Sequence, residues 1–172
     1  QGAPGFPVCE IESPAQALEV PPRCLPVLQV VPVAPPLPWG QIDARAGRLA
    51  GEAVLWATRA ALRGEISAVV TAPLHKEALH AAGAPYDQYP GHTELLQAES
   101  ARHAGVTLAQ MPVRMMLAND ELRVVLVSIH LSLREALDAI TVDRVLETLR
   151  ITHLALSALD ESDHRRGGAL AF

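Results

Sequence analysis

Residues 64–83, GEISAVVTAPLHKEALHAAG, contain the pattern that decides the fold class of this chain. The β-branched run at Ile66–Thr71 predicts a short buried strand. An Ala-Pro step follows the run, and Lys76–Ala82 predicts a helix that stops at Gly83. A strand that leads through a polar loop into a helix is typical of α/β proteins, in which helices pack on a sheet.

The flanking sequence continues this alternation of strands and helices. Further strands are expected at Leu25–Val33, Val113–Leu117 and Leu122–Ile129, and further helices at Gln41–Arg63, from Thr93 to Ala104 and from Val142 to about Leu159. Prolines confine the first strand to a sheet edge, and the turn at residues 118–121 predicts a hairpin. Thr93 and Thr141 are the expected N-caps of the last two helices. The pattern predicts a mixed α/β fold without a Gly-rich nucleotide-binding turn.

Composition narrows the class of protein further. The 172 residues predict one domain, and a net charge of −5 argues against a nucleic-acid partner. The uncharged stretch from Cys24 to Ile42 carries five prolines, which argues against a membrane span. Two cysteines are too few for a disulfide framework, and without a secretory signal a cytoplasmic location is the default. We expect a Pro-rich segment at 1–40, an α/β segment at 41–159 and a separate tail at 160–172.

Three polar segments follow the predicted strands or open a predicted helix, where ligand sites of open α/β sheets lie. They are Thr71–Lys76, Tyr89–Glu94 and Ser128–Ser132. Lys76, the only lysine, is a candidate for pairing with a phosphate, or is a solvated lysine in a first helical turn. His92 and Thr93 suit an anion, although plain capping by Thr93 explains the pattern equally well. His130 is a candidate metal ligand or acid/base, or a histidine that marks the end of a strand.

Taken in order, these segments resemble a known family. TAPLHKEALHAAG, PGHTELL and RMMLANDELRVVLVSIHLSLREALDAIT resemble the 4-hydroxythreonine-4-phosphate dehydrogenases of pyridoxal phosphate biosynthesis, from about Gln41 to Leu159. The resemblance implies a three-layer α/β/α fold with a mixed sheet, akin to isocitrate and isopropylmalate dehydrogenases and incomplete here. It also implies a homodimer with an interfacial active site. The implied reaction is NAD-dependent oxidation and decarboxylation of 4-phosphohydroxy-L-threonine, a phosphorylated small molecule, to 3-amino-2-oxopropyl phosphate.

The resemblance also implies roles for individual residues. His92 and Thr93 would contact the substrate, and His130 would bind a divalent metal such as zinc, magnesium or cobalt, which would polarise the reacting oxygen. Lys76 matches a lysine of the family and is the candidate catalytic residue, acting through active-site electrostatics. The resemblance assigns no residue to NAD.

Several motifs of the family are absent from this chain. They are its glycine-rich opening, its two other metal-binding histidines and the residues that hold the substrate phosphate, and residues 160–172 no longer follow the family. A catalytic metal site normally needs about three protein ligands. A truncated, catalytically inactive chain is therefore one expectation. Another is a relative that oxidises a different phosphorylated hydroxy acid, such as a four-carbon sugar acid phosphate.

Overall fold

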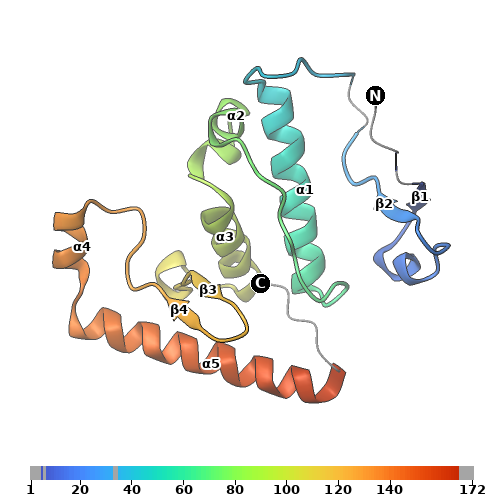
Figure 1. The fold of residues 1–172 in the computed structure, drawn as a ribbon. Helices are drawn as coiled ribbons and strands as arrows, with labels where there is room; N and C mark the ends of the chain where they lie inside the picture. Colours follow the sequence, from blue (N-terminus) through green and yellow to red (C-terminus); the bar gives the residue numbers. More distant parts are fainter. Residues whose placement is uncertain (1–4, 6, 33–34, 167–172) are drawn as a thin grey trace. The chain divides into compact units, whose positions relative to one another are not determined.

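The protein forms two compact units. The computed structural model describes residues 5, 7–32 and 35–166 (Figure 1). The first unit runs to Met111, and the second begins at Pro112. This division lies inside the segment 41–159 that the sequence suggested as one piece, and the segment boundaries expected at 40 and 159 stay predictions.

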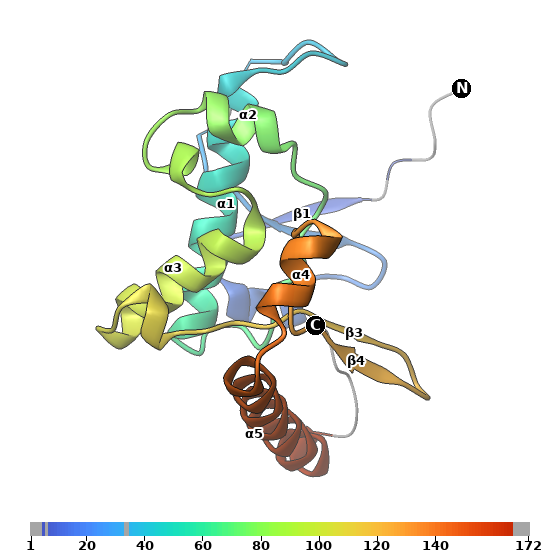
Figure 2. The same cartoon turned by 90° about the vertical axis from the view of Figure 1, so that its left-hand side faces the viewer.

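Three helices build the first unit around a small apolar core. They are α1 (Ala44–Leu62), α2 (Lys76–Ala81) and α3 (His92–Ala104), as the sequence predicted to within three residues at their ends. Both α2 and α3 pack on α1, and the three helices lie together in both views (Figures 1 and 2). The buried core consists of Leu55, Leu79, Ala82, Tyr86 and Leu95.

Local chemistry explains where these helices begin and end. Asp43 caps α1, because its side chain accepts a hydrogen bond from the backbone N–H of Arg45. Beyond the helix ends, Gly64, Gly83 and Gly105 adopt the left-handed backbone that terminates helices.

Tyr86 lies in the short 3-10 turn η2 (Tyr86–Gln88), and burial raises the pKa of its phenol.

A two-stranded parallel sheet precedes the helices. Strand β1 (Val8–Ile11) pairs with β2 (Leu25–Leu28), with Val8 opposite Leu25, and the 3-10 turn η1 (Pro14–Leu18) lies between them. An edge strand beginning at Leu25 is therefore confirmed, but it ends five residues before the expected Val33, which lies outside the described residues. The first strand was missed because proline and acidic residues surround its four residues.

The predicted strand at Ile66–Thr71 is wrong. These residues belong to no sheet in the described part of the chain, and Val70 is 76% exposed. A β-branched run becomes a strand only when a neighbouring strand takes its backbone hydrogen bonds, and neither of the two sheets in the described residues includes this run.

The second unit begins with the predicted hairpin. Strands β3 (Met116–Ala118) and β4 (Arg123–Val125) pair antiparallel and are shorter than expected. The Asn119 side chain holds the turn, since its Oδ1 accepts hydrogen bonds from the backbone N–H groups of Glu121 and Leu122 at 2.9 and 2.7 Å.

Two helices complete this unit. The short α4 (Leu133–Ala139) was not predicted, although Ser132 and Glu135 form a capping box at its start. The long α5 (Val142–Arg166) begins after Thr141, whose Oγ1 accepts from the backbone N–H of Arg144 at 3.3 Å. This cap is confirmed, and the helix continues into the segment that was expected to diverge after Leu159.

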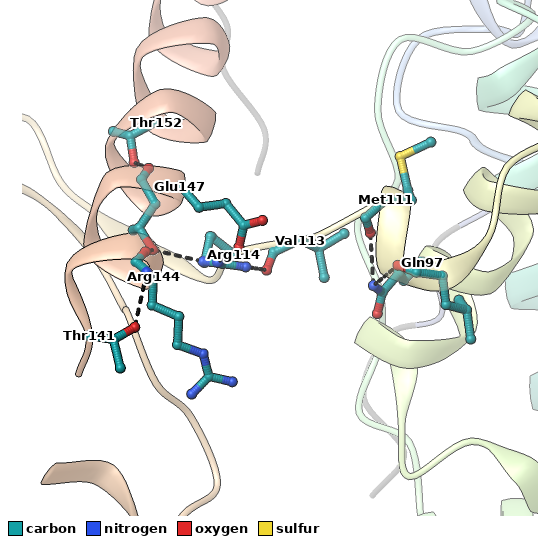
Figure 3. A network of polar contacts seen from close by, with 10 residues as sticks. Gln97, Met111, Val113, Arg114, Thr141, Arg144, Glu147 and Thr152 are labelled. Atoms are coloured by element: carbon teal, nitrogen blue, oxygen red, sulfur yellow. Dashed lines mark hydrogen bonds and ion pairs between the residues drawn. The ribbon is translucent and has the colours of Figure 1, made fainter. Parts of the chain in front are cut away.

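An arginine attaches the chain before β3 to α5. The guanidinium of Arg114 donates to the Thr148 hydroxyl at 2.8 Å and to the Val113 carbonyl at 2.9 Å, and it pairs with Glu147 (Figure 3). Thr148 is buried and donates in turn to the Arg144 carbonyl. These contacts fix the packing of the second unit where it has few apolar contacts.

The fold class is mixed α/β, as predicted from the alternation of helices and strands. Within the described residues, none of the helices has the length and apolar character needed to cross a membrane.

Candidate functional site

The candidate site lies where α2 and α3 begin, both in the first unit. Lys76 is the first residue of α2, after His75, whose Nδ1 accepts from the backbone N–H of Ala78 at 3.3 Å. His92 is the first residue of α3, after Gly91 at the N-cap position. Two of the three polar segments expected to form a site therefore open neighbouring helices that pack on α1.

Thr93 does not cap α3, which corrects the prediction. Gly91 holds the N-cap position, and its carbonyl accepts from the backbone N–H of Leu95 at 3.3 Å. Thr93 is consequently the second residue of the helix, and no side chain caps this N-terminus. The helix starts earlier than expected because the buried Gly91 makes the turn that Thr93 was expected to make.

The side chain of Lys76 reaches the N-terminus of α3. A Cβ placed on Gly91 would lie 3.4 Å from Lys76 Cε and 4.0 Å from Lys76 Nζ. The same position would lie 3.7 Å from an oxygen of the Glu94 carboxylate. The structure thus brings the expected residues Lys76, His92 and Thr93 together at one helix end.

The electrostatics of this helix end favour an anion. The first N–H groups of a helix and the helix dipole attract negative charge, and the Lys76 ammonium adds a full positive charge. Within the described part of the chain, Lys76 has no ion-pair partner. Glu94 opposes the effect, because its carboxylate competes with any bound anion for the same cation.

A cavity of about 440 Å³ adjoins Lys76 beside α2 and η2. It is lined by Lys76, Glu77, His80, Ala81, Asp87, Gln88, Tyr89 and Pro90. His80 Nδ1 lies 3.2 Å from the carbonyl oxygen of Asp87, so this contact links α2 to η2 along the cavity. The cavity gives room for a small molecule beside the Lys76 ammonium.

His130, the candidate metal ligand, belongs to the second unit. It is exposed, and its backbone adopts the left-handed conformation with φ 56°, which few residues other than glycine adopt. No group of three His, Cys, Asp or Glu side chains gathers anywhere in the described residues in a way that could hold a metal. One histidine does not fit a metal centre by itself.

Glu99 is a residue of this region that the sequence analysis missed. Its side chain is 6% exposed and accepts from Arg59 of α1 at 2.8 Å, and it also pairs with Arg102 of α3. A signal was present in the sequence, because Glu99 follows the buried Leu95 by four residues and so faces α1 with it. This carboxylate fixes α3, and thereby His92, against α1.

The middle of α3 is held by an amide. Gln97 Nε2 donates to the backbone carbonyl of Met111 at 2.8 Å and to that of Leu108 at 3.3 Å (Figure 3). The short turn η3 (Leu108–Gln110) is thereby attached to α3. The helix that carries His92 and Thr93 is therefore anchored by Gln97 and Glu99 within the first unit.

Comparison with known proteins identifies related chains. A family model described as pyridoxal phosphate biosynthetic protein PdxA matches residues 5–165. This match extends the resemblance expected from Gln41 to Leu159 at both ends, and it includes residues 160–165, which were expected to diverge.

Curated relatives carry two different names. A 4-hydroxythreonine-4-phosphate dehydrogenase from Beijerinckia indica subsp. indica is 42% identical over 121 residues, which cover 70% of this chain and 32% of the relative. A D-threonate 4-phosphate dehydrogenase from Salmonella typhimurium is 46% identical over 66% of this chain and 32% of the relative. The chain therefore spans about a third of the length of these relatives.

Solved structures agree with these relatives. One from Salmonella typhimurium, described as a 4-hydroxythreonine-4-phosphate dehydrogenase, has a TM-score of 0.74 and 38% identity, over 90% of this chain and 44% of that one. Another from Klebsiella pneumoniae has a TM-score of 0.73 and 34% identity, over 90% of this chain and 43% of that one. These matches confirm the expected fold class, since the chain carries part of the α/β fold of these dehydrogenases.

Proposed function

This chain belongs to the family of the pyridoxal phosphate biosynthetic protein PdxA. On that premise we propose that it is part of an enzyme that oxidises a phosphorylated hydroxy acid. The preferred substrate is 4-phosphohydroxy-L-threonine, which would be oxidised with NAD and decarboxylated to 3-amino-2-oxopropyl phosphate. Relatives named 4-hydroxythreonine-4-phosphate dehydrogenase support this choice.

D-Threonate 4-phosphate is the second candidate substrate. It is a four-carbon sugar acid phosphate, and relatives named after it are 46% identical to this chain. The two substrates share a phosphate and a carboxylate, and differ in carrying an amino or a hydroxyl group. A site that holds the anionic groups therefore serves either substrate.

The observation that carries the proposal is the proximity of the Lys76 side chain to Gly91 at the start of α3. We assign the anionic group of the substrate, phosphate or carboxylate, to this place. The Lys76 ammonium would pair with it, and His92 and Thr93 would donate hydrogen bonds from the first turn of the helix. These residues bind and orient the substrate, and the adjoining cavity gives it room.

Cofactors enter the proposal by way of the family. NAD would accept the hydride, and no residue of this chain is assigned to it. His130 is proposed as one ligand of a divalent ion such as zinc, magnesium or cobalt, within a set that the described residues do not complete. We therefore derive no step of the reaction through a metal. A homodimer with an interfacial site and a cytoplasmic location belong to the same proposal.

The anion site is tested by titrating the 172-residue chain with inorganic phosphate while the amide signals of Gly91, His92 and Thr93 are followed by NMR. We expect saturable shifts at these amides. Lys76→Ala should weaken the affinity about tenfold, the usual effect of losing one charge-assisted hydrogen bond. Glu94→Gln should strengthen it about twofold, because it removes the competing carboxylate.

His103→Ala is the matched control for this titration. His103 lies at the exposed C-terminal end of α3, so its loss should leave the phosphate affinity unchanged. Equal effects of Lys76→Ala and His103→Ala would contradict the proposed site. A repeat with 4-phosphohydroxy-L-threonine and with D-threonate 4-phosphate compares the two candidate substrates directly.

We expect the 172-residue chain alone to reduce no NAD with either substrate. The described residues form an anion site but gather no three side chains that could hold a metal. Absorbance at the NADH band after mixing chain, substrate, NAD and a divalent metal measures the rate. Turnover at a rate ordinary for an enzyme would show that this expectation of an inactive chain is wrong.

A further inference from the structure

We propose that Gly47 and Arg48 of α1 are positioning residues for Lys76. They hold α2 so close to α1 that the Lys76 side chain reaches the N-terminus of α3. The importance of that contact for anion binding rests on the proposed function, whereas the contact itself is a feature of the fold.

Gly47 lets the backbone of α2 lie directly on α1. A Cβ at Gly47 would lie 1.8 Å from the carbonyl oxygen of Ala78, 2.2 Å from its carbonyl carbon and 2.7 Å from the backbone nitrogen of Leu79. All three are backbone atoms, which cannot swing away as the end of a side chain can. Any side chain at position 47 must therefore displace α2 itself.

The displacement would fall on the end of α2 that carries Lys76. Ala78 lies in the first turn of this six-residue helix, two residues after Lys76. The other end is held, because Arg48 Nη2 donates to the carbonyl of Ala82 at 2.6 Å. A shift of the first turn would carry Lys76 away from Gly91.

Gly51 provides a matched comparison one turn along α1. A Cβ there would lie 2.6 Å from two carbons of the Tyr86 ring and 3.2 Å from a methyl carbon of Leu79. These neighbours are side-chain atoms, so the substitution disturbs the core without meeting the backbone of α2. Gly51→Ala should therefore destabilise the fold while leaving Lys76 beside Gly91.

The experiment compares Gly47→Ala and Gly51→Ala in the 172-residue chain by the phosphate titration, with melting temperatures measured for both. We expect both variants to melt at lower temperature. Gly47→Ala should weaken phosphate binding about tenfold, as Lys76→Ala does, and the double variant should be no weaker than either single one. Gly51→Ala should stay within about twofold of the parent chain.

Arg48 supplies a second test in case Gly47→Ala does not fold. Arg48 is an exposed residue, so the Arg48→Ala variant should fold. It should weaken phosphate binding about threefold, because the hydrogen bond that holds the end of α2 is lost. Arg48→Lys keeps a donor for the Ala82 carbonyl and should restore most of the affinity. Unchanged phosphate affinity in a folded Gly47→Ala, or in Arg48→Ala when the glycine variant is unfolded, would overturn the inference.

Failure of the proposed function remains distinguishable from failure of this inference. If the parent chain does not bind phosphate at α3, the proposed site is wrong, and the positioning is then measured by the nuclear Overhauser effect between Lys76 Hε and Gly91 Hα. Loss of that signal in Gly47→Ala, with retention in Gly51→Ala, supports the positioning role. Retention in Gly47→Ala refutes it.

Discussion

Asp43 shows how one partly buried side chain controls the start of a long helix. Its carboxylate accepts a hydrogen bond from the backbone N–H of Arg45 at 2.8 Å. It also accepts hydrogen bonds from the Arg45 guanidinium, the shortest of them from Nη2 at 2.7 Å. The side-chain hydrogen bond from Arg45, followed by the backbone one, lowers the pKa of Asp43 from 3.8 to about 2. The charged form of the cap is therefore favoured in the folded protein.

This pKa shift predicts a pH dependence of stability. Because the folded pKa lies below the ordinary value, the stabilisation is fully present above about pH 4 and is lost as the pH falls toward 2. Asp43→Asn keeps a capping oxygen but not the charge, so the parent chain should exceed it in melting temperature at pH 6, with the gap closing near pH 2. Melting followed by circular dichroism across this range measures the gap, and a gap independent of pH would contradict the assignment.

Glu99 predicts a stability effect at the junction of α1 and α3. Glu99→Gln leaves Arg59 and Arg102 without their buried anion, and we expect the free energy of unfolding to fall by about 1–2 kcal/mol. Urea denaturation measures the change. Glu65→Gln is the control, because Glu65 pairs with Arg63 at the surface, where ion pairs contribute little. Equal midpoints for the two variants would refute the role of Glu99.

Sequence patterns picked out candidate residues that lie close together, but they did not reveal the local roles of these residues. Lys76, His92 and Thr93 were identified from polar segments beside apolar ones, and the structure brings their positions together at one helix end. The cap at Gly91 could not be foreseen, because it depends on how the loop of residues 84–91 packs. Glu94 was passed over for a similar reason, since its effect on Lys76 arises only from their proximity in space.

At the scale of elements, the three helices of the first unit are stabilised mainly by their shared core. Leu79 of α2 and Leu95 of α3 have almost no exposed surface, and both belong to the cluster that includes Leu55 of α1. Because a six-residue helix is too short to be stable alone, α2 depends on this burial.

Leu79→Ala should accordingly cost about 2–5 kcal/mol of the free energy of unfolding, as expected for a large-to-small change in a core. Leu18→Ala is the control, since Leu18 is 95% exposed and its truncation should change the unfolding midpoint little. Urea denaturation with both variants measures the difference. A similar midpoint for the two would mean that α2 does not pack as described.

Helices were predicted more reliably than strands for a physical reason. A helix such as α1 or α3 makes its backbone hydrogen bonds within itself, so caps and periodicity in the sequence largely define it. A strand needs a partner that the local sequence does not reveal. The β-branched run at Ile66–Thr71 belongs to neither of the sheets in the described residues, whereas β3 has its partner strand β4 only a few residues further along the chain.

At the scale of the whole molecule, burial is unevenly divided between the two units. Every buried hydrophobic side chain among the described residues belongs to the first unit, whereas the buried residue of the second is the polar Thr148. Leu133, Leu137, Val142 and Leu149 of α4 and α5 are largely exposed. The second unit therefore has less apolar burial to protect its helices from opening.

Amide hydrogen exchange should reflect this division. We expect the amides of α1 and α3 to exchange more slowly than those of α4 and of the outer turns of α5, because opening of the first unit exposes a core. Exchange followed by mass spectrometry on peptides from each helix measures the rates. Equal protection in α3 and α4 would show that the two units open as one.

The proximity of Lys76 to Gly91 has a consequence for how this protein folds. Every group assigned to the anion site lies between residues 76 and 94, so the site closes through contacts of short sequence separation. Such contacts have a small loop-closure cost and tend to form early. When the chain has left the ribosome as far as α3, all the residues from which this site is assembled are exposed, before the hairpin or α5 has emerged.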